Sequence, residues 1–310
     1  MRVIQFSARA DRLPGSRIAE VPRPEPGPGQ LLVRTEVAGV GVGSVRMLCA
    51  DAAADPGGEM VGTVVAAGPD VDDRWIGTRV GGVVFDAVYA EYVCAAPALV
   101  TEIPEGVDAA AALALVRGGL VALGALRAAG SVAGKSVLIT GAASGSGHLA
   151  VQLARVAGAS EVTAAVGSAG KFDFVAECGA DRALTYDRPW PEGIDVVLDG
   201  VGGELVQRGV DALAPHGTLV AFSAGGGAVD ASTLLGGLKT VTGFSIGLPA
   251  RTQPQLIAGD RARLWELLGE KKIRPRVRVH GWAEMDAVLE SVATRRNLGR
   301  MAVGTDTGGR

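Results

Sequence analysis

One stretch of the chain, residues 136–154, constrains the fold more than any other. It reads SVLITGAASGSGHLAVQLA, an apolar β-branched run followed by a glycine- and serine-rich turn and then apolar residues at helical spacing. This pattern predicts a strand, a tight turn and a helix. Gly141, Gly145 and Gly147 let the backbone bend and approach a ligand, and the helix that follows presents free N–H groups and a positive dipole end. A diphosphate fits such a corner.

We therefore predict that the turn binds the pyrophosphate of a dinucleotide. This fingerprint requires a context of alternating strands and helices, which the rest of the chain supplies. The alternative is a plain strand-to-helix turn without a ligand. The predicted binding residues in the turn are Gly141, Ala142, Ala143, Ser144, Gly145, Ser146, Gly147 and His148.

Strands and helices alternate after this turn. Helices are predicted at 168–178 and 203–213. The predicted strands lie at 162–166, 182–185, 194–198, 218–222 and 241–244. Alternation at this spacing indicates right-handed crossovers and a parallel sheet that is covered on both faces. We predict a doubly wound nucleotide-binding domain.

The first 115 residues or so have a different pattern. A proline-rich segment at 21–29 predicts an extended strap, because proline fixes φ and lacks an N–H donor. Glycine turns cut the short apolar runs at 57–68 and 77–81. Many short strands with glycine turns favour a small, strongly bent antiparallel or barrel-like domain. A closing strand at 297–303 is predicted to rejoin that domain.

Composition excludes several classes of protein. A net charge of −3 gives no electrostatic footprint for nucleic acid or for an acidic membrane surface. The three cysteines, Cys49, Cys94 and Cys178, are far apart and form neither a disulfide framework nor a zinc lobe. We expect neither a signal peptide nor a membrane-spanning helix, which needs ~18 apolar residues. A cytoplasmic protein with a small-molecule substrate and no nucleic-acid or membrane partner is expected.

The order and spacing of these motifs resemble the zinc-independent quinone oxidoreductase-like branch of the medium-chain dehydrogenase/reductase superfamily. The resemblance covers almost the whole chain. The motifs that carry it are GEMVGTV at 58–64, GTRV at 77–80, YAEY at 89–92, the glycine-rich turn, DVVLDGVGG at 195–203 and the closing Gly299-Arg300.

The resemblance implies an α/β protein of two domains. A bent-barrel, GroES-like catalytic domain is expected at 1–115 and 262–310, and a doubly wound Rossmann domain with a parallel sheet at 116–261. The active site is expected in the cleft against the nucleotide domain. Family members are commonly dimers, so a homodimer is expected.

Zinc ligands are missing from the positions that zinc-dependent relatives use. Those relatives place a histidine immediately before the glutamate that corresponds to Glu59, and this chain has Gly58 there. The segment 41–44 has no cysteine or histidine, and no four-cysteine lobe is present. We expect no metal.

The end of the second strand of the predicted parallel sheet favours NADPH. An NAD site usually has a carboxylate there to accept from the ribose, whereas this chain has Gly167, Ser168 and Lys171. No carboxylate repels a 2′-phosphate, and a hydroxyl and an ammonium are available. By resemblance, Lys171 matches a phosphate-binding lysine and Tyr186 a tyrosine that flanks the phosphate. The alternative is that Ser168 caps a helix and Lys171 is solvated.

The resemblance implies hydride transfer from NADPH to an enone, an enoyl thioester or a quinone. The protein then orients the acceptor, excludes water and stabilises the enolate oxygen. By family position, Tyr89, Phe222 and Ser223 line the cleft, although such aromatic residues are as often core residues. Arg117 is a candidate for binding an anion or an enolate. The alternative is that the Arg117 side chain is solvated or forms a salt bridge and has no role in binding.

Two departures from the family keep other functions open. The family's Asn-x-x-Asp aligns with GVGS at 41–44, so both polar side chains are missing, and the substrate loop at 44–56 is short. The leading hypothesis is an NADPH-dependent reductase of activated double bonds or quinones, with biosynthetic tailoring as one role. A second is a reductase fold recruited for non-redox cyclisation or isomerisation. A third is a nucleotide-binding protein without turnover.

Overall fold

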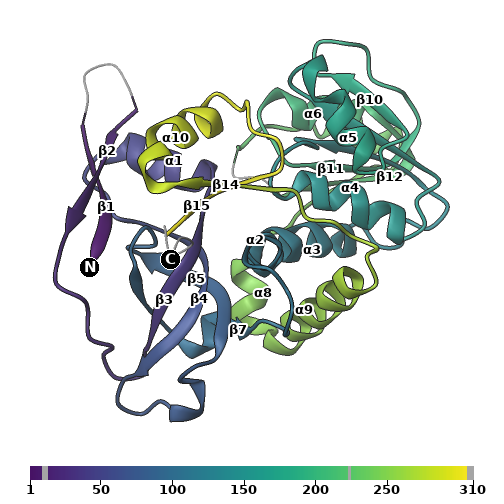
Figure 1. Cartoon of the computed structure of the whole chain (residues 1–310). Coiled ribbons are helices and arrows are strands. Elements are labelled where there is room, and N and C mark those ends of the chain that lie inside the picture. The colour runs from purple at the N-terminus through teal and green to yellow at the C-terminus, as the bar shows by residue number, and fades with distance from the viewer. Residues whose placement is uncertain (9–12, 223–224, 306–310) are drawn as a thin grey trace. The chain divides into compact units, whose positions relative to one another are not determined.

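A computed structural model describes residues 1–8, 13–222 and 225–305, and the chain divides into two compact units (Figure 1). Unit 1 comprises Met1–Arg117 and Arg276–Arg310, and unit 2 comprises Gly118–Pro275. Each unit has its own sheet and its own packed interior. This two-unit α/β architecture confirms the predicted fold class.

Unit 1 is built on a seven-stranded sheet within its described residues, in the order β14-β15-β3-β4-β5-β7, with β6 paired to β3. All its pairs are antiparallel except β14 with β15. The strands are β3 (Leu31–Val40), β4 (Pro56–Ala67), β5 (Arg79–Asp86), β6 (Tyr92–Ala95), β7 (Val100–Glu102), β14 (Val277–Gly281) and β15 (Arg300–Gly304). The C-terminal strand thus rejoins the first domain, as predicted.

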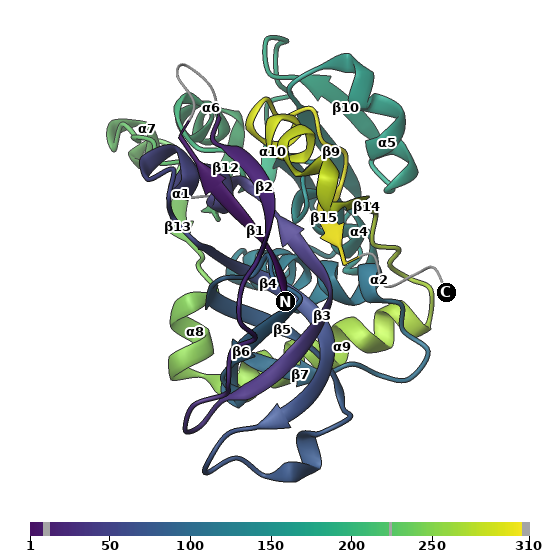
Figure 2. The same ribbon diagram turned by 60° about the vertical axis from the view of Figure 1, so that its left-hand side comes forward.

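Unit 1 also contains a two-stranded ribbon and two helices of nine residues each. Figure 2 shows the ribbon, in which β1 (Arg2–Ser7) pairs antiparallel with β2 (Gly15–Glu20). The predicted loop after β3 is instead helix α1 (Val42–Ala50), because Val45 and Leu48 lie on one helical face and are buried. Helix α10 (Met285–Ala293) buries Met285, Val288, Leu289 and Val292 at helical spacing.

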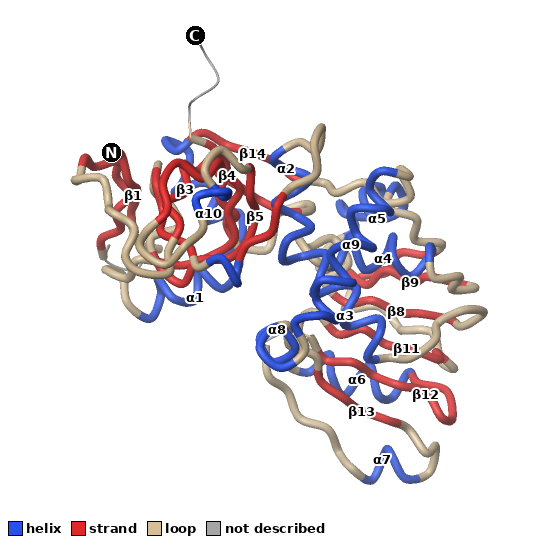
Figure 3. Tube along the Cα trace, turned by 90° about the horizontal axis from the view of Figure 1, so that it is seen from below, coloured by secondary structure: helices blue, strands red, loops and turns tan. Residues whose placement is uncertain are grey.

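Unit 2 contains a six-stranded sheet within its described residues, in the order β10-β9-β8-β11-β12-β13. Every pair is parallel, and Figure 3 shows β9, β8, β11, β12 and β13 side by side. The strand order reverses between β8 and β11, which is where such sheets bind ligands. The strands are β8 (Ser136–Thr140), β9 (Glu161–Val166), β10 (Arg182–Thr185), β11 (Ile194–Asp199), β12 (Leu213–Ala221) and β13 (Thr240–Gly243).

The helices of unit 2 follow the predicted alternation. They are α3 (Leu120–Ala128), α4 (Gly147–Val156), α5 (Phe172–Glu177), α6 (Glu204–Ala212), α7 (Ser232–Leu235), α8 (Gly247–Thr252) and α9 (Pro254–Gly269). The chain returns to unit 1 at Arg276 and not at 262, because α9 belongs to unit 2. An ion pair of 2.5 Å joins Arg127 of α3 to Asp260 of α9.

One helical stretch differs from the sequence expectation. Ala109–Ala128 comprises α2 (Ala109–Leu113), a π-helical turn (Ala114–Gly119) and α3, and it is long and apolar enough to cross a membrane. Most of its apolar window, 72%, is buried inside the protein. A core helix passes the same test of length and composition, so this stretch is weak support for a membrane span.

Candidate functional site

The glycine-rich turn of unit 2 connects the end of β8 to the start of α4. Gly141 adopts a φ of +62°, in the left-handed region that favours glycine. A side chain at Gly147 would overlap the carbonyl oxygen of Gly141. The turn therefore requires glycine at both positions.

Ser144 and His148 hold this turn from within. The Ser144 hydroxyl accepts a hydrogen bond of 3.0 Å from the Gly147 N–H. The Ser144 carbonyl oxygen lies 2.9 Å from His148 Nδ1, and because a carbonyl only accepts, this nitrogen carries the proton. His148 is fully buried, with its ring 6.1 Å from that of Phe174. Its imidazole thus supports the turn from the interior, where it does not face a ligand.

Gly145 and Ser146 are two residues of the turn whose amides remain for a ligand. Within the described part of the chain, neither N–H has an acceptor, whereas Ala142 donates to the carbonyl of Ala165 at 3.3 Å. Gly145 and Ser146 directly precede α4, whose N-terminal end carries a partial positive charge. The two N–H groups are thus available to an anion at this helix end.

A second loop is tied to this turn at the switch point of the sheet. The Thr140 hydroxyl donates to Asp199 Oδ1 at 2.6 Å, and it accepts from the Gly200 N–H at 3.0 Å. Asp199 is 1% exposed and also accepts from the Gly202 N–H at 2.8 Å. A buried carboxylate thus fixes the loops after β8 and β11. The sequence signal for this carboxylate is the run DGVGG at 199–203, part of a motif that carries the family resemblance.

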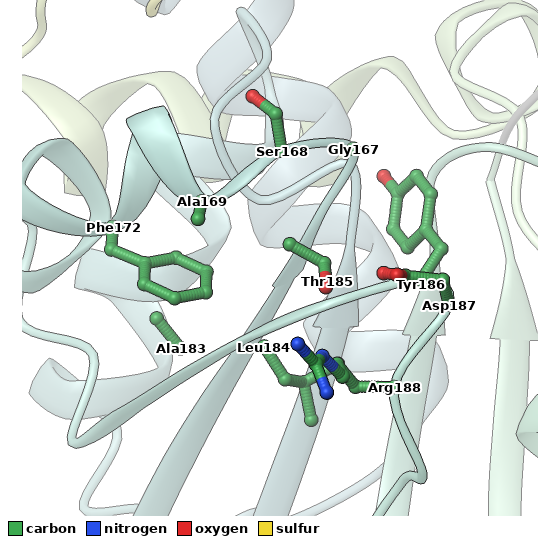
Figure 4. A pocket seen from close by; sticks show the side chains of 10 residues that line it. All are labelled: Gly167, Ser168, Ala169, Phe172, Ala183, Leu184, Thr185, Tyr186, Asp187 and Arg188. Carbon is green, nitrogen blue, oxygen red and sulfur yellow. The ribbon is translucent and has the colours of Figure 1, made fainter.

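An open hollow of about 650 Å³ lies at the carboxyl ends of β9 and β10 (Figure 4). Its lining residues are Gly167, Ser168, Ala169, Phe172, Ala183, Leu184, Thr185, Tyr186, Asp187 and Arg188. Three of these, Gly167, Ser168 and Tyr186, are predicted cofactor-binding residues. The Tyr186 hydroxyl accepts from the Gly141 N–H at 3.0 Å, so the hollow adjoins the glycine-rich turn.

The charged residues of the hollow differ from those expected. Lys171 lies at the end of the 3-10 turn Ala169–Lys171 and is not among the residues that line the hollow. Asp187 and Arg188, which the sequence analysis missed, do line it. A hydrogen bond to Thr185 and the nearby Arg188 hold the pKa of Asp187 below its usual value. Ser168 makes no side-chain capping bond, so the helix-cap alternative is not observed.

The predicted residues after β12 have separate outcomes. The Phe222 N–H donates to the Asp199 carbonyl at 2.9 Å, and its ring lies against Gly200, where a Cβ would come within 2.7 Å. Phe222 therefore packs on the loop after β11. Ser223 lies outside the described residues.

In unit 1 a buried carboxylate is shared by two arginines. The side chain of Glu59 is 3% exposed, and its two oxygens pair with Arg300 Nη2 and, at 3.2 Å, with Arg117 Nη1. Burial lowers the pKa of Arg300 to about 10, which leaves it charged at neutral pH. Room for its guanidinium depends on Gly41, because a Cβ there would lie 2.7 Å from Arg300 Nη1. The three side chains carry a net charge of +1.

Arg117 has a free edge. It lies in the π-helical turn Ala114–Gly119, a type of irregularity found frequently at functional sites. Its side chain is 48% exposed, and its Nε and Nη2 have no partner among the described residues. Arg117 is thus salt-bridged on one edge, as the alternative interpretation holds, and available to an anion on the other.

Tyr89 lies in the core of unit 1. It is 2% exposed, and its hydroxyl is 2.9 Å from Ser44 Oγ and 3.2 Å from the Gly39 carbonyl oxygen, to which it donates. Burial raises the pKa of Tyr89 to about 12. The hydroxyl is therefore neutral and hydrogen-bonded within the chain, as the alternative of a core residue holds.

The described residues contain no group of three or more histidine, cysteine, aspartate or glutamate side chains that could hold a metal. Cys49 is exposed, Cys94 is half-buried and Cys178 is buried, and none of the three forms a disulfide among the described residues. His280 of β14 lies 2.9 Å from Glu284 of the 3-10 turn that follows this strand.

Comparisons with known proteins agree with this geometry. Residues 145–258 match the family described as zinc-binding dehydrogenase, a range that excludes Gly58 and Glu59. The chain is 30% identical over 241 residues to prostaglandin reductase-3 of Bos taurus, and the match covers 73% of this chain but only 61% of that protein.

Two solved structures are similar over nearly the whole chain. One is a mycobacterial protein, Rv1454c, complexed with NADPH, at 25% identity and a TM-score of 0.85, with 98% of this chain and 100% of that chain covered. The other is a quinone oxidoreductase of Pseudomonas syringae pv. Tomato DC3000, at 23% identity and a TM-score of 0.86, with 98% and 99% covered. The second likeness concerns the fold alone.

A parallel nucleotide-binding sheet in one unit and a mixed, strongly bent sheet in the other define the medium-chain dehydrogenase/reductase superfamily. Within it, the chain belongs to the zinc-independent quinone oxidoreductase-like branch. The resemblance found in the sequence is confirmed.

Proposed function

We propose that this protein is an NADPH-dependent reductase that transfers hydride to an activated C=C bond or to a quinone, without zinc. The observation that carries the proposal is that the amides of Gly145 and Ser146 have no acceptor among the described residues. These amides directly precede α4, next to a hollow at the carboxyl ends of β9 and β10. A helix end with free N–H groups is an anion site, and the hollow accommodates a phosphorylated ribose. NADPH complexed with the mycobacterial relative supports the choice of coenzyme.

The residues present fit this coenzyme. The amides of Gly145 and Ser146 would hold the diphosphate, and Gly167, Ser168 and Tyr186 would surround the phosphorylated ribose. Only a glycine at 147 leaves the turn open, because a Cβ there would overlap the Gly141 carbonyl. When bound, NADPH supplies the hydride.

Arg117 is the residue we propose for the acceptor. Its free guanidinium edge donates to the oxygen of an enone, enoyl thioester or quinone, on which negative charge develops as hydride arrives. Glu59 fixes the other edge, so the arginine is oriented before the acceptor binds. The name of the bovine relative, a prostaglandin reductase, supports a reductase activity.

The test is the oxidation of NADPH, followed at 340 nm against a panel of enones, enoyl thioesters and quinones. Coenzyme-dependent turnover of at least one class is the expected result. Calorimetry measures NADPH binding separately. An absence of binding at millimolar NADPH would refute the proposal.

A non-redox function is the second candidate. The segment 41–44 lacks the family's polar pair, and its one hydroxyl, that of Ser44, is occupied by Tyr89. A protein that binds NADPH tightly and oxidises none with any acceptor would favour cyclisation, isomerisation or a binding role. Product analysis with polyunsaturated substrates would then distinguish catalysis from binding alone.

We also propose a homodimer formed through the β13 edge of the unit 2 sheet. β13 pairs only with β12 among the described strands, which leaves one edge open. Leu235 and Leu238, next to this strand in the chain, are 78% and 63% exposed. An open edge flanked by exposed apolar side chains is a pairing surface. The three cysteines form no disulfide among the described residues, which suits a cytoplasmic location.

A further inference from the structure

We propose that Arg188, and not Lys171, is the main cation that distinguishes NADPH from NADH in this protein. The inference deepens the proposed function and rests on coenzyme binding at the hollow. It specifies the ligand group, a monophosphate ester on the adenosine ribose, and the side chain that recognises it.

Arg188 is in the right place for this task. It lines the hollow together with Gly167, Ser168 and Tyr186, whereas Lys171 does not. Figure 4 shows its guanidinium extending from the loop after β10 toward Leu184. The residue is exposed, and among the described residues its guanidinium forms no ion pair, although the Asp187 carboxylate beside it attracts it. An arginine presents several N–H donors in one plane, which suits a phosphate.

The loop that carries Arg188 is fixed by a second arginine. Arg208 of α6 donates through Nη1 to the Tyr186 carbonyl and through Nη2 to the Arg188 carbonyl. The Arg208 guanidinium carbon lies 4.7 Å from the centre of the Trp190 ring, a cation–π contact. The Arg188 N–H also donates to the Thr185 carbonyl at 3.1 Å. The backbone that carries Arg188 is thus positioned before a ligand binds.

Asp187 sets the opposing preference in the same hollow. The hydrogen bond from Thr185 keeps its carboxylate ionised, and a carboxylate repels a phosphate while it accepts from a ribose hydroxyl. Neighbouring residues thus act in opposite directions: Arg188 favours the 2′-phosphate and Asp187 disfavours it. This opposition makes the proposal testable with a pair of variants.

The test measures binding of 2′,5′-ADP and of 5′-AMP by calorimetry, with NADPH and NADH as the full coenzymes. Arg188→Gln should weaken 2′,5′-ADP by about tenfold or more and leave 5′-AMP nearly unchanged, since a charge-assisted bond to the phosphate is lost. Arg188→Lys should restore part of the affinity. Asp187→Asn should strengthen 2′,5′-ADP. The matched control is Arg182→Gln, an exposed arginine of β10 that does not line the hollow.

The outcomes separate this inference from the proposed function. If wild-type protein prefers NADPH but Arg188→Gln keeps the same preference, the assignment of Arg188 is overturned and the reductase proposal stands. The same holds if Lys171→Gln abolishes the preference and Arg188→Gln does not. If wild-type protein binds neither coenzyme, both proposals fail. Circular dichroism of each variant verifies that an altered affinity does not reflect unfolding.

Discussion

At the scale of single residues, Glu59 is the side chain on which most of the charge in unit 1 depends. It is almost fully buried and neutralises one of the two guanidinium charges that contact it. Because Arg117 and Arg300 share one carboxylate, the cluster keeps a net positive charge, and Arg117 is its half-exposed member. Removing one partner of a buried ion pair is costly, because the remaining charge is left in the interior without its partner and without solvation by water.

Glu59→Gln should therefore lower the free energy of unfolding by about 3 kcal/mol. Arg117→Gln should cost at most about 1 kcal/mol, because its pair is half exposed and the Glu59–Arg300 contact remains. Urea unfolding of both variants measures the difference. Because Glu59→Gln removes both pairs, equal losses would show that the pair with Arg117 accounts for most of the stabilisation.

Arg117→Gln should also have an effect on catalysis that is separate from its effect on stability. Arg117→Gln is expected to lower kcat/KM with an enone or quinone at least tenfold while NADPH affinity is retained, because Arg117 acts on the acceptor. Steady-state kinetics and a coenzyme titration measure the two quantities. Unchanged kcat/KM would leave Arg117 as a salt-bridged surface residue.

Tyr89 gives a prediction for alkaline pH. Burial raises the pKa of Tyr89 from its usual value of 10.0 to about 12, so the folded state retains a proton that the unfolded state loses. The contribution of Tyr89 to stability is complete below pH 10 and falls as the pH rises toward about 12. Wild type and Tyr89→Phe should thus show the same tyrosinate absorbance at 295 nm below about pH 11 while folded. A difference that appears near pH 10 would contradict the burial of this hydroxyl.

Sequence reasoning at this scale identified residue types better than it placed side chains. Gly167, Ser168 and Tyr186, which the sequence predicted as coenzyme-binding residues, line the hollow, because each follows the end of a recognised strand. Arg188 was missed, since its place depends on how a loop turns after β10. Tyr89 was placed at the cleft by family position, whereas it lies between β5 and β6 and is buried in the core of unit 1. A motif match does not show which way a side chain points.

At the scale of elements, the turn between β8 and α4 is the feature that sequence alone predicts best. Its glycines are required by backbone geometry, so their spacing is visible without any tertiary information. Helix α1 is the opposite case. Comparison with the family placed a substrate loop at 44–56, whereas burial of Val45 and Leu48 on one helical face makes residues 42–50 a helix.

Gly147→Ala should weaken NADPH binding at least tenfold, because its Cβ would overlap the Gly141 carbonyl and lie 2.9 Å from Ser144 Oγ. The free amides of Gly145 and Ser146 would then be displaced. The matched control is Gly259→Ala in α9, where an added Cβ meets nothing within 4 Å. Calorimetry with NADPH measures both. Normal binding by Gly147→Ala would show that the coenzyme does not use this corner.

At the scale of the whole molecule, the division into two units was visible in the sequence as a change from short glycine-cut strands to strand–helix alternation. The second boundary was harder to place. Residues 262–269 are the second half of α9, and the contacts of this helix with α3 and α8 place it in unit 2. Helical periodicity shows that a face is buried but not against which neighbour.

Assembly provides a prediction at this scale. Replacing both Leu235 and Leu238 with aspartate should convert the proposed dimer to a monomer, since charges next to the β13 edge oppose pairing. Light scattering after size exclusion measures the mass. Phe85→Asp is the control, because Phe85 is also 78% exposed but lies in unit 1. A wild-type monomer, or a dimer that survives the double substitution, would rule out this interface.

The hydrogen bond between the Tyr186 hydroxyl and the Gly141 amide has one more consequence. A single phenol touches both the adenosine end and the diphosphate end of the proposed coenzyme site. Ordering of this ring by one half of the molecule lowers the entropic cost of docking the other half. Intact coenzyme should therefore bind more tightly than its separate fragments would together predict, and Tyr186→Phe should erase part of that cooperative gain.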